Sequence, residues 1–159
     1  MLLIDYYNCL DQMGVKIDDW FPRSLKLAHD MAVKNRSVVI SEQRQKRFAE
    51  VVKDPAYQAL TYADKDWVVL APSESKDLIT EGRRQSHCVG SYVDYVADRE
   101  KFILFMRRAD DLETPVITLD VDPEHNTLNQ YRGFGNRAPN DEEMAFIRKW
   151  AKKKKLKIV

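Results

Sequence analysis

Glycine is distributed unevenly along this chain, and that distribution constrains the fold more than any other feature. Four of the five glycines lie in two short polar segments. Residues 81–92 read EGRRQSHCVGSY, and residues 130–137 read QYRGFGNR. Glycine serves where the backbone bends or approaches another group closely, and it weakens regular elements. Because both segments also carry titratable side chains, they predict a shaped site.

Length and composition predict one globular domain. The chain has 159 residues, 44% of them hydrophobic and 32% charged, which is enough for a single core. A formal net charge of +1 argues against coating nucleic acid by bulk attraction, so any nucleic-acid surface must be a local patch. No run approaches the ~18 apolar residues of a membrane span. Cys9 and Cys88 form no disulfide framework, so we expect a cytoplasmic protein without membrane contact.

The first half of the sequence predicts a helical lead-in. Apolar residues follow helical spacing over residues 2–10, and a second helix opens near Pro22 and places Leu25, Ala28, Met31 and Ala32 on one face. A third helix runs from Glu42 through Val52 and is broken or kinked at Pro55. We assign residues 1–64 to this lead-in, either as a separate module or as part of one domain.

The second half, residues 65–159, predicts a small antiparallel sheet flanked by helices. Strands are expected at 67–70, 102–107, 116–121 and 128–134, with a possible edge strand at 156–159, and the turn at 122–126 pairs the third with the fourth. Ser73 or Ser75 is expected to cap a helix that reaches Gly82, and another turn or two of helix follows Tyr92. A last helix begins at Asn140. The expected fold class is α+β.

Alternation along two of these strands predicts a polar patch on one sheet face. Thr118 and Asp120 share a face of their strand, and Gln130 and Arg132 share a face of the next one with Leu128 and Phe134. If the register brings the two polar pairs opposite each other, Arg132 can pair with Asp120 and turn its guanidinium toward a phosphate. The alternative is a solvated outer sheet face.

The candidate catalytic residues are His87, Tyr92, Asp120 and Gln130. His87 leads, because an unperturbed pKa of about 6.5 suits proton transfer. The alternatives are a histidine that bonds backbone to hold the Gly90 turn and a tyrosine that belongs to the core. Cys88 is adjacent to His87 and cannot form a catalytic pair with it, so a small buried role is expected.

No cofactor is expected, and the sequence lacks the paired short spacings of a zinc site. His29, His87 and His125 lie far apart, although a site of His87 with a carboxylate such as Asp120 stays open. The segment Gly133–Arg137 can bind phosphate through backbone N–H groups, but it lacks the strand–loop–helix context of a nucleotide loop. Its alternative is a turn with Gly135 or Asn136 at positive φ.

Basic residues crowd the end of the chain. Cations there complement the dipole of the last helix, which is one explanation for them. Their number exceeds what capping requires, so they also predict contacts with the phosphates of DNA or RNA. The candidate nucleic-acid-binding residues are Arg132, Arg137, Lys149, Lys152, Lys153, Lys154 and Lys155.

The two glycine-containing segments, the strands between them and the last helix with Phe146 and Trp150 resemble the PcfJ-like proteins. The resemblance extends over about residues 67–155 and, more loosely, over residues 21–66. It implies a setting in conjugative plasmids, phages or other mobile genetic elements. It implies no settled chemistry.

Three hypotheses follow. The first is an accessory nucleic-acid-binding protein of a mobile element, which contacts phosphates through the basic last helix and the arginines of the strand and turn. The second is an enzyme acting on nucleic acid or a nucleotide, with His87 in a polar site on the sheet. The third is a regulator that binds another protein. This partner is either a host protein, such as a defence complex, or another protein of the mobile element.

Overall fold

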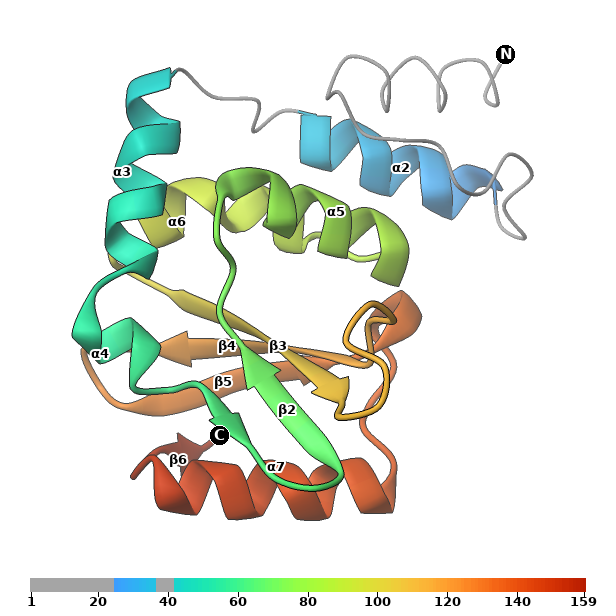
Figure 1. Ribbon diagram of the computed structural model, residues 1–159. Helices are drawn as coiled ribbons and strands as arrows, with labels where there is room; N and C mark the ends of the chain where they lie inside the picture. Colours follow the sequence, from blue (N-terminus) through green and yellow to red (C-terminus); the bar gives the residue numbers. More distant parts are fainter. Residues whose placement is uncertain (1–24, 37–41) are drawn as a thin grey trace.

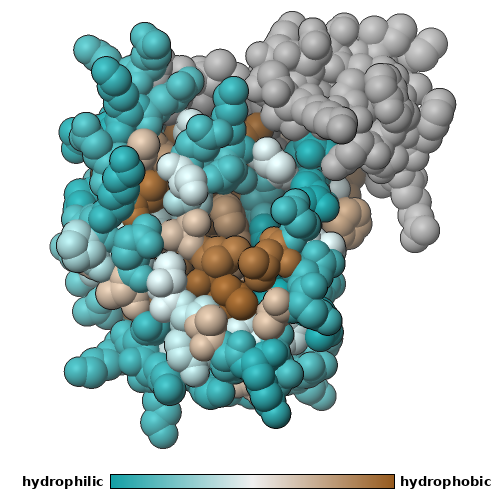
Figure 2. All heavy atoms as spheres, in the orientation of Figure 1, coloured by the Kyte–Doolittle hydropathy of each residue, from teal (hydrophilic) through white to brown (hydrophobic). Residues whose placement is uncertain are grey.

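A computed structural model describes residues 25–36 and 42–159 (Figure 1). It shows a single six-stranded sheet with helices on both faces. The expected α+β class is therefore confirmed. The helix predicted over residues 2–10, and the opening of the second helix near Pro22, lie outside the described residues. The face shown in Figure 2 is mostly hydrophilic, with a compact hydrophobic area near its centre.

The helices follow the sequence pattern closely. Asp54 starts α4, because its side chain accepts a hydrogen bond from the N–H of Ala56 at 2.8 Å. Asn140 starts the last helix in the same way, accepting from the N–H of Glu143 at 2.8 Å. The helices are α2 (Leu25–Arg36), α3 (Glu42–Val52), α4 (Pro55–Gln58), α5 (Ser75–Gln85), α6 (Val93–Ala97) and α7 (Asp141–Lys153), with 3₁₀ turns η1 (Val89–Tyr92) and η2 (Phe134–Asn136).

The cap expected at Ser73 or Ser75 is wrong. The N-cap of α5 is Glu74, and Ser75 is already helical. The carboxylate of Asp77 reaches back instead and accepts hydrogen bonds from the N–H groups of Ser73, at 2.7 Å, and of Glu74, at 3.2 Å. A carboxylate in the first turn accepts two such bonds and also faces the positive end of the helix dipole.

The strands run in spatial order from β1 to β6. Neighbours are antiparallel except β5 and β6, which are parallel. Strand β5 ends at Arg132, two residues before the predicted end, because Phe134 enters the 3₁₀ turn η2 and is 61% exposed. The strands are β1 (Tyr62–Ala63), β2 (Trp67–Leu70), β3 (Phe102–Arg108), β4 (Ile117–Asp122), β5 (Thr127–Arg132) and β6 (Lys157–Ile158).

The two faces of the sheet differ in chemistry. Helix α7 covers one face, and α5 and α6 lie over the other (Figure 1). The α7 side is an apolar core in which Ile147 and Trp150 are fully buried, and the indole N–H of Trp150 donates to the carbonyl of Leu60 at 2.8 Å. On the opposite face, Thr118 pairs with Arg132 and Asp120 with Gln130 across β4 and β5. We call this the polar face.

A β-bulge changes which residues of β5 reach the polar face. The register shifts between Asp120 and Val121, so that Leu128 pairs with Val121 while Gln130 pairs with Asp120. Simple alternation placed Leu128 beside Gln130, and that expectation is wrong. The extra residue turns Leu128 into the apolar core, where it is fully buried.

Helices α3 and α4 pack onto the sheet. Phe48 and Tyr57 belong to the same buried core cluster as the strands, and Arg47 of α3 donates to the carbonyl of Ala97 in α6 at 2.8 Å. The hydroxyl of Tyr57 donates to the carbonyl of Ile103 at 2.6 Å and accepts from its N–H at 2.8 Å. Strand β2 pairs with β3 only as far as Phe105, so it offers no partner to the backbone of Ile103. The Tyr57 hydroxyl binds the N–H and the carbonyl of Ile103 instead.

We expect Tyr57→Phe to lower the free energy of unfolding by about 3 kcal/mol, because it leaves a buried N–H and a buried carbonyl without a partner. Denaturant unfolding measures the change. The matched control is Tyr131→Phe, which removes a hydroxyl that bonds the carbonyl of Val159 at 3.1 Å at an exposed position. Equal losses in the two variants would contradict the edge-pairing role of Tyr57.

Candidate functional site: a cavity on the polar face

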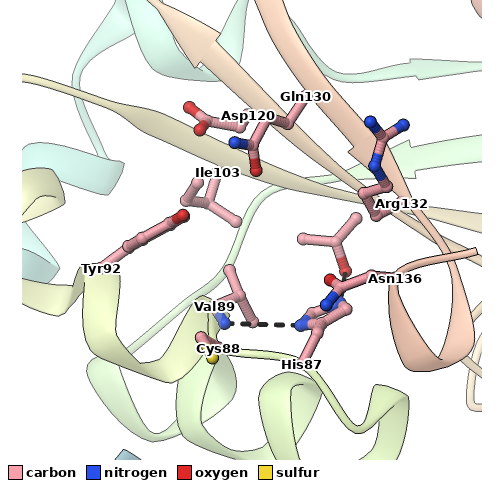
Figure 3. A pocket seen from close by; sticks show the side chains of 10 residues that line it. His87, Cys88, Val89, Tyr92, Ile103, Asp120, Gln130, Arg132 and Asn136 are labelled. Atoms are coloured by element: carbon pink, nitrogen blue, oxygen red, sulfur yellow. Dashed lines mark hydrogen bonds between the residues drawn. The ribbon is translucent and has the colours of Figure 1, made fainter. Parts of the chain in front are cut away.

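A cavity of about 320 Å³ lies between the polar face and the segment that follows α5. Figure 3 shows Gln130 reaching into it from β5, Tyr92 entering from the opposite wall, and Asn136 lying close to His87. The structure thus brings together all four candidate catalytic residues. The lining residues are His87, Cys88, Val89, Tyr92, Ile103, Thr118, Asp120, Gln130, Arg132 and Asn136.

The end of α5 positions His87. Ser86 adopts a left-handed backbone conformation with φ of 51°, which reverses the chain direction. The N–H of His87 then donates to the carbonyl of Gly82 at 3.0 Å, closing the helix end. This turn brings the His87 ring against the polar face of the sheet, where the residue is 4% exposed.

A chain of hydrogen bonds links α5 to the polar face. Arg107 of β3 forms a buried ion pair with Glu81 of α5. The hydroxyl of Thr118 donates to Glu81 at 2.9 Å, and the Nε2 atom of His87 lies 3.1 Å from the same hydroxyl oxygen. The N–H of Val89 lies 3.4 Å from Nδ1 of His87. Each polar group in this buried chain therefore has a partner.

This arrangement determines the protonation state of His87. Nδ1 accepts from the N–H of Val89, so the ring proton resides on Nε2 and is donated to Thr118. Burial lowers the pKa of His87 from its usual 6.5 to about 4. Both ring nitrogens are engaged and the ring is neutral at pH 7. The geometry favours the structural alternative for His87, that of a residue that holds its turn, over a general base.

Asp120 lies at the other end of the cavity. It is 3% exposed, and its Oδ2 atom accepts from Nζ of Lys101 at 2.8 Å. Its Oδ1 atom is buried and has no hydrogen-bond partner in the part of the chain that the structure describes. Burial raises the pKa of Asp120, against the opposing effect of Lys101. Nζ of Lys101 also lies 5.0 Å from the ring centroid of Tyr92.

The expected pair between Arg132 and Asp120 does not form. Lys101 takes that place, and the guanidinium of Arg132 donates to the carbonyl of Tyr131 at 3.3 Å. Arg132 extends away from Asp120 at the rim of the cavity (Figure 3). The reason is register: Arg132 stands opposite Thr118, two residue pairs beyond Asp120.

Three residues that support this site were not among its candidate residues: Glu81, Lys101 and Arg107. Arg107 carried a usable signal, because it is charged and alternates in step with the apolar Ile103 and Phe105 of the same strand. Such a residue must pair with an opposite charge if the strand is central. Lys101 and Glu81 carried no comparable signal, since each depends on how a loop or helix packs.

Cys88 is half-buried at the cavity wall. Its thiol contacts the sulfur of Met31 in α2 at 3.1 Å. Among the described residues, no three His, Cys, Asp or Glu side chains gather where they could hold a metal ion. Nor does any described helix have the length and apolar character to cross a membrane.

The segment Gly133–Arg137 forms a tight turn in which both Gly135 and Asn136 have positive φ, 61° and 64°. Arg137 folds back across Gly133 and binds Glu143 at the start of α7 with two contacts, of 2.8 and 3.0 Å. A Cβ on Gly133 would lie only 2.8 Å from this guanidinium. The glycine is therefore needed for the close passage of Arg137.

The candidate nucleic-acid-binding residues do not form one patch. Five lysines at the end of α7 and the start of β6 form what we call the basic end: Lys152, Lys153, Lys154, Lys155 and Lys157. Arg132 lies on the polar face, whereas α7 covers the other (Figure 1). Arg137 is bound to Glu143, which lies about 14 Å along the helix from Lys152.

A second hollow of about 230 Å³ lies on the other side of the Glu81–Arg107 pair. Leu70, Phe105 and Leu112 supply its apolar wall, and Leu112 is 50% exposed. Arg84 at its edge donates to the carbonyl of Glu113 at 2.7 Å. The ion pair itself lines this second hollow, together with Asp77 and Thr80.

A family model described as PcfJ-like protein matches residues 2–147 of the chain, which confirms the expected resemblance. A curated protein of Listeria innocua serovar 6a, described as the uncharacterized protein Lin1253/Lin1744, is 30% identical over 156 residues. The match covers 93% of this chain and 33% of the relative, so the chain spans about a third of that relative's length. No solved structure matches the chain.

The depressed pKa of His87 predicts a specific dependence of stability on pH. The folded value of about 4 lies below the unfolded value of 6.5, so the unfolded chain takes up the proton first. This contribution to stability is complete above pH 6.5 and is lost as the pH falls toward 4. We expect it to amount to about 3 kcal/mol between pH 7 and pH 4.

Urea unfolding across this pH range, compared with the His87→Gln variant, measures that contribution. The variant should lose less stability on acidification than the parent, whatever its stability at pH 7. His125→Gln is the control, because His125 is exposed and its pKa is raised by Asp122. A parallel pH profile for the parent and His87→Gln would contradict the neutral buried ring.

Proposed function

The chain belongs to the PcfJ-like family, and from this premise we propose that it is an accessory nucleic-acid-binding protein of a mobile genetic element, such as a plasmid or a phage. The setting rests on the family resemblance. The molecular activity rests on the basic end, which we propose contacts the phosphates of DNA or RNA.

The observation that carries the proposal is the absence of acidic partners around the basic end. Lys149, one turn earlier, pairs with Asp64 at 3.2 Å. Within the described part of the chain, none of the five lysines of the basic end forms an ion pair. Clustered like charges repel one another, and the negative charge of phosphates would offset this repulsion. The counterions that the nucleic acid releases on binding would add to the affinity.

An aromatic ring lies within the same surface. Nζ of Lys153 lies 5.2 Å from the ring centroid of Tyr62, and Nζ of Lys154 lies 5.7 Å from it. Lysines interleaved with an aromatic ring are typical of surfaces that bind single strands, where bases stack and phosphates meet cations. Tyr62 is half-buried, so part of its ring faces solvent.

Lys155 supports a role beyond helix capping. Its φ is 58°, in the left-handed region that favours glycine. A non-glycine residue there costs roughly 1–2 kcal/mol. A cation in the last turn of a helix returns only about 0.3–1 kcal/mol. A lysine at this position is thus less favourable for the fold than glycine, which supports a role for its charge in binding.

A quadruple variant tests the basic end: Lys152, Lys153, Lys155 and Lys157, each changed to Gln. We expect the slope of log binding constant against log salt concentration to fall by roughly 3 on duplex DNA, because phosphate contacts are lost. Electrophoretic shift over a salt series measures it, with single-stranded DNA, duplex DNA and RNA as separate probes.

The matched control changes four other exposed lysines, Lys46, Lys53, Lys65 and Lys76, to Gln, which alters the net charge equally. If the control weakens binding as much, contact through the basic end is wrong. Binding of no nucleic acid by the parent protein would overturn the proposal and direct attention to a protein partner. Cleaved strands in the same samples would show an enzyme.

A single substitution separates folding from binding. Lys155→Gly should raise the free energy of unfolding by about 1 kcal/mol, because glycine accepts the left-handed conformation, and should weaken nucleic-acid binding. Thermal unfolding and the same shift assay measure the two effects. A variant that is both more stable and equally tight in binding would show that Lys155 contributes nothing to recognition.

A further inference from the structure

The cavity on the polar face is a second candidate binding site, apart from the basic end. Its volume of about 320 Å³ lies at the lower end of the range for small-ligand sites. Asp120, Gln130 and Arg132 line it from the polar face, whereas α7 covers the other face of the sheet (Figure 1). Its occupant would therefore be bound independently of phosphates on the basic end.

Asp120 indicates what the occupant must offer. The residue is 97% buried, yet its Oδ1 atom has no partner among the described residues, while Lys101 satisfies Oδ2. A buried carboxylate oxygen without a donor is unfavourable by more than an ordinary unmade hydrogen bond. Because Asp120 lines the cavity, a ligand N–H placed there would satisfy this oxygen.

Gln130 supplies the complementary group. It stands directly opposite Asp120 across β4 and β5, and its amide has no hydrogen bond within the described part of the chain. Side chains opposite each other in this way lie roughly 5 Å apart at Cβ. Oδ1 of Asp120 accepts a hydrogen bond, and the neighbouring amide of Gln130 can both donate and accept. These two groups together match the adjacent donors and acceptors on the edge of a nucleobase.

Arg132 adds a cation near these two groups, on the same strand as Gln130. It is two residues beyond Gln130 on β5, about 7 Å along the strand. It is exposed, and its guanidinium donates to the carbonyl of Tyr131 and lies 5.7 Å from the centroid of the Tyr131 ring, without an ion pair among the described residues. Its guanidinium can therefore turn over the cavity mouth and take a phosphate with two parallel hydrogen bonds.

We propose that this cavity binds a nucleotide, with the base edge against Asp120 and Gln130 and the phosphate on Arg132. The ring of Tyr92 forms the opposite wall, and the neutral His87 holds the floor through Thr118. The same geometry suits a free nucleotide and one unstacked nucleotide of a strand. The chemistry recognised is common to both.

Isothermal titration with adenosine, guanosine, cytidine and uridine 5′-monophosphates tests this site. At least one should bind, and the corresponding nucleoside and inorganic phosphate should each bind at least tenfold more weakly. Arg132→Gln should weaken the nucleotide about tenfold and leave the nucleoside unchanged, because it removes one charge-assisted contact. Gln130→Ala should weaken both.

Arg148→Gln is the matched control, since Arg148 is an exposed arginine of α7 on the other side of the sheet. It should leave nucleotide affinity unchanged. The proposal is overturned if no nucleotide binds at millimolar concentration, if inorganic phosphate binds as tightly as the nucleotides, or if the control weakens binding as much as Arg132→Gln. A short single-stranded oligonucleotide that competes with the nucleotide identifies a strand as the source. Lack of competition identifies the free nucleotide.

The two proposals can fail separately. The four glutamine substitutions of the basic end should leave nucleotide affinity in the cavity unchanged. Loss of nucleotide binding in that variant, with the fold intact by circular dichroism, would overturn the independence of the cavity.

Discussion

The buried ion pair between Glu81 and Arg107 is the constraint on which the polar face depends. The residues are 3% and 6% exposed, and they join α5 to a central strand of the sheet. Removing one partner of such a pair leaves an uncompensated buried charge, at a cost of about 3–5 kcal/mol. Thr118 and His87 extend the pair by hydrogen bonds, so the position of the cavity floor follows from the position of this pair.

The polar face therefore has two regions with different roles. In the first, Glu81, Arg107, Thr118 and His87 bind one another, and the region serves to hold the helical layer on the sheet. Around Asp120 the partners are incomplete, and the surface opens into the cavity. The same strands supply both regions, because alternate residues of β3 and β4 point to one face. The α7 side is apolar around Ile147 and Trp150, and the basic end lies at the edge of that layer.

Much of the fold was predictable because it depends on local signals. The bounds of α3 and β2 follow from Pro55, from Pro72 and from apolar periodicity, and the start of α7 follows from the side chain of Asn140. The grouping of Thr118 with Asp120 follows from strand alternation alone. The cap of α5 was missed because Asp77 competes with two serines for the same backbone groups, and sequence does not show which wins.

The sequence predicted which residues belong to the candidate site, but it did not predict which of them contact one another. The sequence by itself determined that Thr118 and Asp120 share a strand face, where glycine permits a turn, and that the last helix ends in a run of lysines. The tertiary structure decided that Lys101 rather than Arg132 meets Asp120, that a bulge buries Leu128, and that Arg137 binds Glu143. These outcomes depend on register and on packing between segments far apart in the chain. Alternation and capping act over a few residues, and they carry no information about such contacts.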